Sequence, residues 1–207
     1  MGPLIQSLID NGYLKTKRII KAFQEIKRKD FVPKGKINQA QANYPVSIGQ
    51  GQTISQPLTV AFMLEQLSPK KGDKILDVGS GSGWVSALLA YIVGKDGKVY
   101  ALERIPQIKE FGKKNVSKYN FVKSGRVEFY LGDGYKGLKS KAPFDKIHVA
   151  AAASEIPSLL IKQLKTPGKI ILPIKPEQAL LLIEKTKKGM KKKKFSGFRF
   201  VPLIKTT

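Results

Sequence analysis

The chain has 207 residues, of which 42% are hydrophobic and 26% charged, and this composition suits one compact domain with its own core. It contains no cysteine and one histidine, which excludes disulfides, thiolate nucleophiles and cysteine-bearing zinc sites, and no metal site is expected. The 38 basic and 15 acidic residues give a net charge of +23, a field that attracts nucleic acid, anionic membranes or acidic polypeptides.

Residues 1–54 are expected to form a helical extension that precedes the main sheet. Apolar residues recur at helical spacing in two pieces between residues 4 and 31, and Asn11-Gly12 separates the two pieces. An irregular stretch containing proline and glycine follows, up to Gly51. A third helix is predicted to begin near Ser55-Gln56-Pro57, where a capping residue precedes a proline in the first turn.

Residues 55–174 are predicted to form an α/β core, because strands and helices alternate from residue 74 onward. The predicted strands are 74–78, 98–102, 126–131, 144–151 and 169–172, and the predicted helices are 84–93, 107–118 and 157–164. Such alternation is typical of a Rossmann-like, doubly wound and mostly parallel sheet with right-handed crossovers.

Residues 175–207 are predicted to form a C-terminal β-hairpin. Its two strands would be the apolar stretches 178–185 and 195–203. The lysine-rich run 185–194 would then lie at the solvated tip, where like charges cost least. We interpret this run as a solvated surface or a weak electrostatic patch.

A glycine-rich loop, Asp-Val-Gly-Ser-Gly-Ser-Gly at 77–83, joins the first core strand to its helix. Glycine at every second position allows positive φ and close approach of a ligand to the backbone, beside the free N–H groups of the helix N-terminus. A dinucleotide fingerprint would need glycine where Trp84 stands, and a P-loop would need Gly-Lys-Ser/Thr. The observed G-x-G-x-G spacing after an acid is the pattern of enzymes that use S-adenosylmethionine (AdoMet), and it predicts a class I AdoMet-dependent methyltransferase fold. The cofactor-binding residues predicted in this loop are Asp77, Gly79, Ser80, Gly81, Ser82 and Gly83.

Two further acids, Glu103 and Asp133, close the next two predicted strands. Because the carboxyl ends of parallel strands meet at one edge of a sheet, Glu103 is expected to meet ribose hydroxyls and Asp133 an adenine amine. Three acids at consecutive strand ends favour a nucleoside site over an ordinary strand–helix turn. Arg104 and Gly134 are predicted cofactor contacts beside them. We interpret His148, inside the fourth predicted strand, as structural.

The stretch Ser-Ile-Gly-Gln-Gly-Gln-Thr-Ile-Ser-Gln-Pro at 47–57 resembles the substrate motif of the protein-L-isoaspartate (D-aspartate) O-methyltransferases. The similarity continues at 77–83, 102–106, 132–134, 142–149, 155–157, 163–165 and 200–203, so it covers nearly the whole chain. The resemblance implies methylation of the α-carboxylate of isoaspartyl residues in damaged proteins, after which the ester cyclises to a succinimide. It also implies that Ser55 is the catalytic hydroxyl at the acceptor carboxylate, and that residues 1–54 lie on the substrate side. The implied substrate-binding residues are Thr53, Ile54, Gln56 and Pro57.

The residue chemistry is consistent with this reaction. A carboxylate with a pKa of ~4 is already ionised at neutral pH, so its methylation needs no general base. The reaction then depends on in-line positioning and partial desolvation of the nucleophile, which hydroxyls, backbone amides and glycines can provide. An enzyme of this kind can therefore work with one histidine and without cysteine.

Alternative functions remain open at this point. One is carboxyl methylation of an aspartate in a dedicated peptide. Another, suggested by the charge, is an RNA methyltransferase or a basic RNA-binding protein on the same fold. Amino-methylating enzymes, however, carry an Asn/Asp-Pro-Pro-aromatic motif after the fourth strand, where this chain has Val149 and four alanines, and cytosine C5 methylation needs a cysteine.

No apolar run has the length of a membrane span, and the N-terminus lacks the pattern of a signal peptide. We therefore expect a cytoplasmic monomer that acts on damaged proteins or peptides. Contact with nucleic acid is expected only through non-specific charge.

Overall fold

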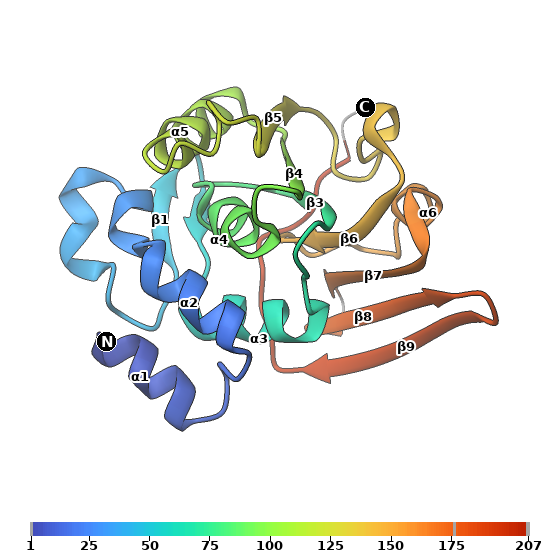
Figure 1. The fold of residues 1–207 in the computed structure, drawn as a ribbon, viewed down its shortest axis with the longest axis horizontal. Coiled ribbons are helices and arrows are strands. Elements are labelled where there is room, and N and C mark those ends of the chain that lie inside the picture. Colours follow the sequence, from blue (N-terminus) through green and yellow to red (C-terminus); the bar gives the residue numbers. More distant parts are fainter. Residues whose placement is uncertain (1, 176, 206–207) are drawn as a thin grey trace.

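The computed structural model describes residues 2–175 and 177–205 (Figure 1). The N-terminal part is helical, as predicted, with a break after Asn11. The elements before the central sheet are α1 Pro3–Asp10, α2 Lys17–Glu25, the 3-10 helices η1 Arg28–Phe31 and η2 Lys34–Gln39, strands β1 Val46–Gly49 and β2 Gln52–Ile54, and α3 Pro57–Leu67.

A seven-stranded sheet forms the centre of the molecule, in the order β5-β4-β3-β6-β7-β8-β9. Its strands are β3 Lys74–Val78, β4 Lys98–Glu103, β5 Val127–Leu131, β6 Phe144–Val149, β7 Leu164–Ile174, β8 Ala179–Thr186 and β9 Gly189–Ser196, and its connections include α4 Trp84–Val93, α5 Pro106–Ser117, η3 Lys139–Lys141 and α6 Ser158–Lys162. Strands β3 to β7 pair in parallel, whereas β8 and β9 are antiparallel. The predicted Rossmann-like, mostly parallel α/β fold is confirmed.

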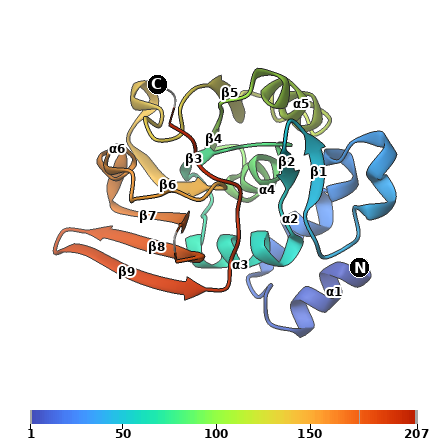
Figure 2. The ribbon, with the colours of Figure 1, turned by 180° about the vertical axis from the view of Figure 1, so that it is seen from behind.

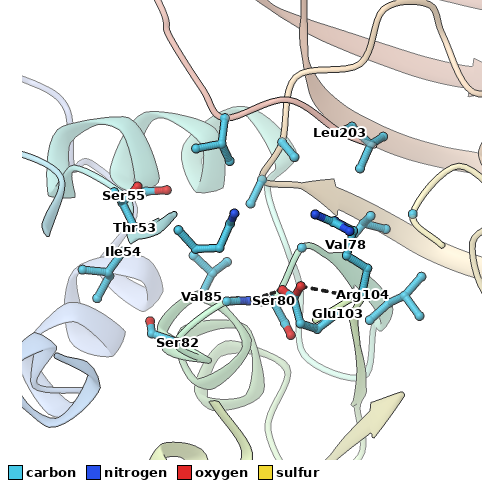
Figure 3. Close-up of a pocket in the computed structure, with 18 of the residues that line it drawn as sticks. Thr53, Ile54, Ser55, Val78, Ser80, Ser82, Val85, Glu103, Arg104 and Leu203 are labelled. Carbon is cyan, nitrogen blue, oxygen red and sulfur yellow. Dashed lines mark hydrogen bonds between the residues drawn. The ribbon is translucent and has the colours of Figure 1, made fainter. Parts of the chain in front are cut away.

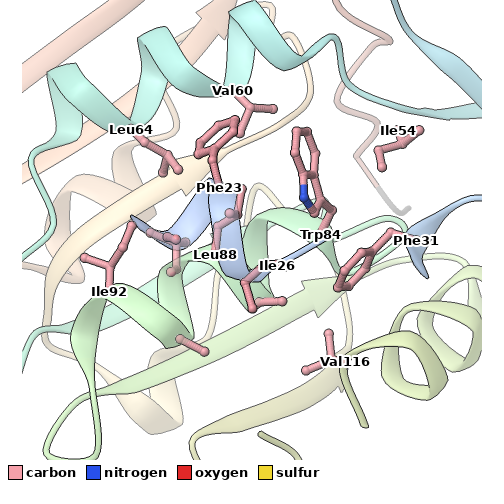
Figure 4. Close-up of a cluster of buried hydrophobic side chains, with 14 of the residues drawn as sticks. Phe23, Ile26, Phe31, Ile54, Val60, Leu64, Trp84, Leu88, Ile92 and Val116 are labelled. Carbon is pink, nitrogen blue, oxygen red and sulfur yellow. The ribbon is translucent and has the colours of Figure 1, made fainter. Parts of the chain in front are cut away.

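Apolar layers cover both faces of the parallel strands, which explains why β3 reads as a nearly continuous apolar run. On one face, Ile75 belongs to a cluster shared with α2, α4 and α5, and Figure 4 shows its centre around Phe23, Trp84 and Leu88. On the other face, Leu76 and its neighbours pack against the region of α6. The strand order reverses between β3 and β6, so the loops at their carboxyl ends diverge and leave room for a ligand.

The stretch predicted as irregular before Gly51 contains a small antiparallel hairpin, β1–β2. The helix that follows begins at Pro57, close to its predicted start, but its cap has another origin. Gln56 is the N-cap residue and its side chain does not cap the helix. Instead, the Asn43 side-chain oxygen accepts from the Leu58 N–H at 3.0 Å. Asn43, 15 residues before Leu58, thus provides the acceptor for an N–H group of the first turn of α3. The Ser55 hydroxyl does not cap this helix.

The C-terminal hairpin forms with its first strand, β8, close to the predicted 178–185, but the second strand and the tip were predicted wrongly. Its turn lies at Thr186–Gly189, and Lys191–Lys194 pair with Leu181–Glu184 as part of β9. Residues 197–203, predicted to continue the second strand, leave the sheet and run past α3 toward the carboxyl ends of the parallel strands (Figure 2). The reason is register: pairing with β7 buries Leu180 on one face of β8 and Ile183 on the other, and β9 needs only to cover the edge of β8. Among the described residues, no helix is long and apolar enough to cross a membrane.

Candidate active site

A pocket lies where the parallel strands end, between the glycine loop, the β2–α3 connection and the C-terminal segment (Figure 3). It is lined by Gln52, Thr53, Ile54, Ser55, Val78, Gly79, Ser80, Gly81, Ser82, Trp84, Val85, Leu102, Glu103, Arg104, Gly132, Gly134, Ala150, Ala151, Val201, Pro202, Leu203 and Ile204. Residues from the carboxyl ends of β3, β4, β5 and β6, which are far apart in sequence, thus meet at the pocket. Of the three acids predicted at these strand ends, Glu103 is in the lining, whereas Asp77 and Asp133 are not.

The glycine loop is held against the end of β4 by its backbone. The N–H groups of Gly79 and Ser80 donate to the Leu102 carbonyl at 2.8 and 3.1 Å. Gly79 and Gly81 adopt φ values of 74° and 54°, the left-handed region that favours glycine. The loop consequently turns tightly and exposes backbone, together with Ser80 and Ser82, to the pocket.

Glu103 is the buried acid of the pocket. Its Oε2 accepts from the Gly81 N–H at 3.0 Å, and its Oε1 accepts from the N–H groups of Arg104 and Ile105 at 2.8 and 3.1 Å (Figure 3). A carboxylate has about four acceptor positions, so capacity remains on Oε2 for a hydroxyl donor. The side chain is 6% exposed, and the three backbone bonds hold it in one orientation.

Asp77 lies behind the pocket wall, not on it. Its Oδ2 accepts from the Ser86 hydroxyl of α4 at 2.5 Å, and its Oδ1 lies 2.8 Å from His148 Nδ1 on β6. Asp77 and His148 are register partners in adjacent strands, and both are almost fully buried. The pair joins β3 to β6 directly below the loops that carry Gly79 and Ala150. His148 therefore has the structural position expected for it.

Gly83 and Asp133 are also set back from the described pocket wall. A Cβ on Gly83 would lie 2.7 Å from Val116 Cγ2 and 2.8 Å from the Gly112 carbonyl oxygen, so this glycine permits α4 to pack against α5. The Asp133 carboxylate accepts from the Tyr135 N–H at 2.8 Å. Its neighbour Gly134 does line the pocket.

A second groove opens beside the pocket and shares four of its residues. The shared residues are Thr53, Ser55, Ala150 and Val201. The rest of the groove is formed by Tyr13, Pro45, Gln56, Leu58, Thr59, Phe62, Gln178, Ser196, Gly197, Phe198, Arg199 and Phe200. We call it the acceptor groove. Ser55 stands at the junction of the two spaces, and its hydroxyl makes no hydrogen bond to any described residue.

Arg28 organises the backbone around Ser55, and sequence reasoning missed it. Its Nη1 donates to the carbonyls of Ala40 and Ala42 at 3.1 and 3.0 Å, and its Nη2 to those of Tyr44 and Ser55 at 2.9 and 3.2 Å. The guanidinium carbon also lies 5.5 Å from the centre of the Trp84 ring. Burial lowers the pKa of Arg28 to about 10, so the group remains charged at neutral pH. Arg28 is one of 38 lysine and arginine residues in the chain, and nothing in the neighbouring sequence distinguishes it.

Other residues that the predictions missed include those of the C-terminal segment and the alanines after β6. Ala152 N–H donates to the Val201 carbonyl, and Leu203 N–H donates to the Ala152 carbonyl, both at 2.8 Å. These bonds place residues 201–204 across the pocket. Gly197 and Pro202 were the available signals, because both residues disfavour the interior of a strand.

Of the residues predicted to bind cofactor or substrate, most line the pocket: Thr53, Ile54, Ser55, Gly79, Ser80, Gly81, Ser82, Glu103, Arg104 and Gly134. Gln56 lines the acceptor groove, and Pro57 is buried at the start of α3. Two residues that line the pocket each have a buried polar atom without a hydrogen-bond partner among the described residues, Ser80 Oγ and Trp84 Nε1.

The sheet order and the pocket at its switch point are those of a Rossmann-like fold, and the following structural match assigns it to the class I methyltransferases. A crystal structure named as a protein-L-isoaspartate O-methyltransferase from Plasmodium falciparum, in complex with S-adenosyl-L-homocysteine, superposes with a TM-score of 0.89 and 28% identity, covering 98% of this chain and 97% of that one.

Sequence comparison identifies the family. The family model for protein-L-isoaspartate(D-aspartate) O-methyltransferase matches residues 2–207. Protein-L-isoaspartate O-methyltransferases from Methanopyrus kandleri and Ignicoccus hospitalis are 40% and 42% identical to this chain, each over 97% of it and over 89% and 95% of their own lengths. The chain belongs to the protein-L-isoaspartate(D-aspartate) O-methyltransferase family.

Proposed function

We propose that this chain transfers a methyl group from AdoMet to the α-carboxylate of isoaspartyl residues in damaged proteins. The observation that carries the proposal is the position of Ser55 at the junction of the pocket and the acceptor groove. Membership of the family supports the same reaction, and so does the name of the Plasmodium falciparum relative, which was crystallised with the demethylated product of AdoMet.

The pocket residues have the chemistry to hold AdoMet. Glu103 retains acceptor capacity for ribose hydroxyls, while Ser80, Gly81 and Ser82 offer hydroxyls and backbone from a loop without bulky side chains. Arg104 and Gly134 also line this pocket. Asp77 and Gly83 act from behind, because they hold the loop against β6 and α5. When bound, AdoMet supplies the methyl carbon, to which an acceptor oxygen bonds while the carbon–sulfur bond breaks and its electron pair stays on sulfur.

The acceptor groove has the chemistry to hold a carboxylate. Ser55 and Thr53 bring hydroxyl groups to its inner end, and Arg199 is the one charged residue on its described wall. A cationic wall favours an anionic acceptor. The carboxylate is already the nucleophile, so Ser55 needs only to orient one oxygen by donating a hydrogen bond to the other. Arg28 holds the Ser55 backbone in place for this task.

The test is methyl transfer from labelled AdoMet to one peptide in isoaspartyl and normal aspartyl forms. We expect base-labile label on the isoaspartyl form only. Ser55→Ala should lower kcat/KM by about ten- to a hundredfold, the range for one hydrogen bond to a charged group. Ser117→Ala, at the exposed end of α5, removes an unrelated hydroxyl and is the matched control. Label on neither form would refute the proposal, and label on the aspartyl form would show a different acceptor.

Cofactor binding is tested separately by calorimetry. Glu103→Gln keeps the shape of the side chain but removes its charge, and we expect AdoMet affinity to fall about tenfold or more. Glu110→Gln makes the same change on the exposed face of α5 and should leave affinity unaltered. Equal affinity in both variants would contradict the assignment of Glu103.

A further inference from the structure

The densest charge of the chain lies on the outermost strand of the sheet. In β9, Lys191–Lys194 follow one another, and each is exposed. Pairing with β8 puts Lys191 and Lys193 on the α3 face of the sheet, and Lys192 and Lys194 on the opposite face. No further strand pairs with β9 among the described residues, and Figure 1 shows it at the outer margin of the fold. The edge therefore offers backbone N–H and C=O groups flanked by positive charge on both sides.

Most of this charge has no counter-charge among the described residues. Lys194 pairs with Glu177 at 2.8 Å, whereas Glu184, the register partner of Lys191, lies 3.8 Å from Lys169 instead. Among the described residues, Lys191, Lys192 and Lys193 form no ion pair. We call these three residues the lysine edge. Their charges are available to an external partner.

The lysine edge continues into the acceptor groove. β9 ends at Ser196, and Ser196–Val201 form one wall of the groove. That wall carries Arg199, which is exposed and whose Nε donates to Gln178 Oε1 at 2.8 Å. In Figure 2 the chain passes from the end of β9 alongside α3, where the other wall of the groove begins. Positive charge thus extends from the mouth of the groove along the free edge of the sheet.

We infer that the lysine edge and Arg199 bind acidic residues of the substrate polypeptide that flank the methylated site. This inference rests on the proposed function. The flanking segment would lie extended along β9, where strand pairing satisfies backbone groups and carboxylates meet lysines on either face. Lys191 lies five positions before Ser196, a span of roughly 17 Å at strand spacing, so acidic side chains several positions from the isoaspartate can reach Lys191.

The surroundings favour an acidic polypeptide over nucleic acid. The aromatic rings nearest the lysine edge pack on one another: Phe62 lies 4.9 Å from Phe195 and 5.1 Å from Phe198 between ring centres. The Lys193 ammonium also lies 5.0 Å from the centre of the Phe195 ring, so a cation rather than a base occupies that ring face. The lysine edge also lacks the arginine forks that read base edges. A free strand edge, in contrast, is shaped for another extended chain.

The experiment compares KM for three isoaspartyl peptides, which carry a neutral flank, an acidic flank of four glutamates, or a basic flank of four lysines. We expect KM for the acidic peptide to be about three- to thirtyfold lower than for the neutral one, as two or three screened charge pairs allow. The advantage should disappear in ~0.5 M salt. Equal KM values for all three peptides would overturn the inference while leaving the proposed function intact.

Variants locate the effect. Lys191→Gln/Lys192→Gln/Lys193→Gln should abolish the preference for the acidic peptide. The control variant, Lys113→Gln/Lys114→Gln/Lys123→Gln, loses the same number of charges from exposed positions in and after α5. It should keep the preference for the acidic peptide. Loss of the preference in both variants would show an effect of net charge alone. An unchanged preference in the first variant would show that the lysines only protect the edge from pairing.

Direct binding separates the inference from the proposed function. Fluorescence anisotropy measures the affinity of the protein for a labelled acidic peptide without isoaspartate, and for a single-stranded RNA of equal charge. If no peptide is methylated but acidic-peptide binding depends on Lys191–Lys193, the proposed function is wrong, whereas the lysine edge is still a binding surface for acidic peptides. If the lysine variant loses RNA binding but not peptide binding, the edge is a nucleic-acid surface and the inference is wrong.

Discussion

Two basic regions of this protein use positive charge in opposite ways. Arg28 is 4% exposed and donates to four backbone carbonyls, so one cation organises the chain around Ser55. The lysine edge is exposed and makes no ion pair with any described residue, so its charges act outward. Net charge alone therefore says little about function. What matters is whether a cation has been desolvated, and which acceptors replaced the water.

The comparison explains why the two regions should respond differently to mutation. A buried cation loses its hydration, and here carbonyl oxygens replace it without a carboxylate among the described residues. Removing it leaves those carbonyls without donors. An exposed lysine keeps its hydration, so removing it costs the folded state little. Stability should therefore follow burial and acceptor number rather than charge.

The largest effect is expected for Arg28→Met. The carbonyls of Ala40, Ala42, Tyr44 and Ser55 would lose their donors, and we expect the free energy of unfolding to fall by about 2–5 kcal/mol. Urea unfolding followed by circular dichroism measures it. Arg18→Met is the matched control, because Arg18 is exposed and makes one bond, to the Pro69 carbonyl at 3.3 Å. An equal decrease in the free energy of unfolding for Arg28→Met and Arg18→Met would contradict the expectation that stability follows burial and acceptor number.

Local patterns predicted the parts of the fold in which neighbouring residues decide the outcome. Strand 74–78 and helix 84–93 were predicted with the bounds observed for β3 and α4, because an apolar run and a glycine turn lie together in sequence. The convergence of Glu103 with the glycine loop was equally predictable, since parallel strands of one sheet end at one edge.

Parts that depend on long-range pairing were not predictable in this way. Asp77 precedes the glycine loop, but only strand pairing shows that its side chain meets His148 behind the pocket. The hairpin tip was misplaced because lysines favour solvent equally well at a turn and on an edge strand. Arg28 carries no sequence signal, because its four acceptors are backbone groups brought together by the fold.

The ion pair of Lys98 on β4 and Glu128 on β5 is intermediate in exposure between Arg28 and the lysine edge, because its side chains are 37% and 32% exposed. The hydrogen bond from Lys98, followed by one from Tyr130, lowers the pKa of Glu128 below its ordinary value of 4.5. Stability from this shift is present above pH 4.5 and is lost as the pH falls through the lowered pKa. The bond to Glu128 also raises the pKa of Lys98 above 10.5, so the pair is lost again as the pH rises through that raised value.

We therefore expect Glu128→Gln to lower the free energy of unfolding at pH 7 by less than ~1 kcal/mol, since solvent screens a pair this exposed. The difference from the wild type should shrink as the pH falls below 4.5, the ordinary value for this carboxyl group. Denaturant midpoints at a series of pH values measure it. A difference that stays constant down to pH ~2 would mean that the side chain contributes by packing rather than by charge.

The smallest effect on stability is expected for the combined replacement of Lys191, Lys192 and Lys193 by glutamine. These side chains have no ion pair among the described residues, so the free energy of unfolding should change by no more than ~0.5 kcal/mol. At low salt the sign should be stabilising, because the chain carries +23 and repels itself. The same unfolding measurement, repeated at low and high salt, tests both statements. A loss near that of Arg28→Met would mean that the lysine edge holds the sheet together, and its charge would then no longer be available to a partner.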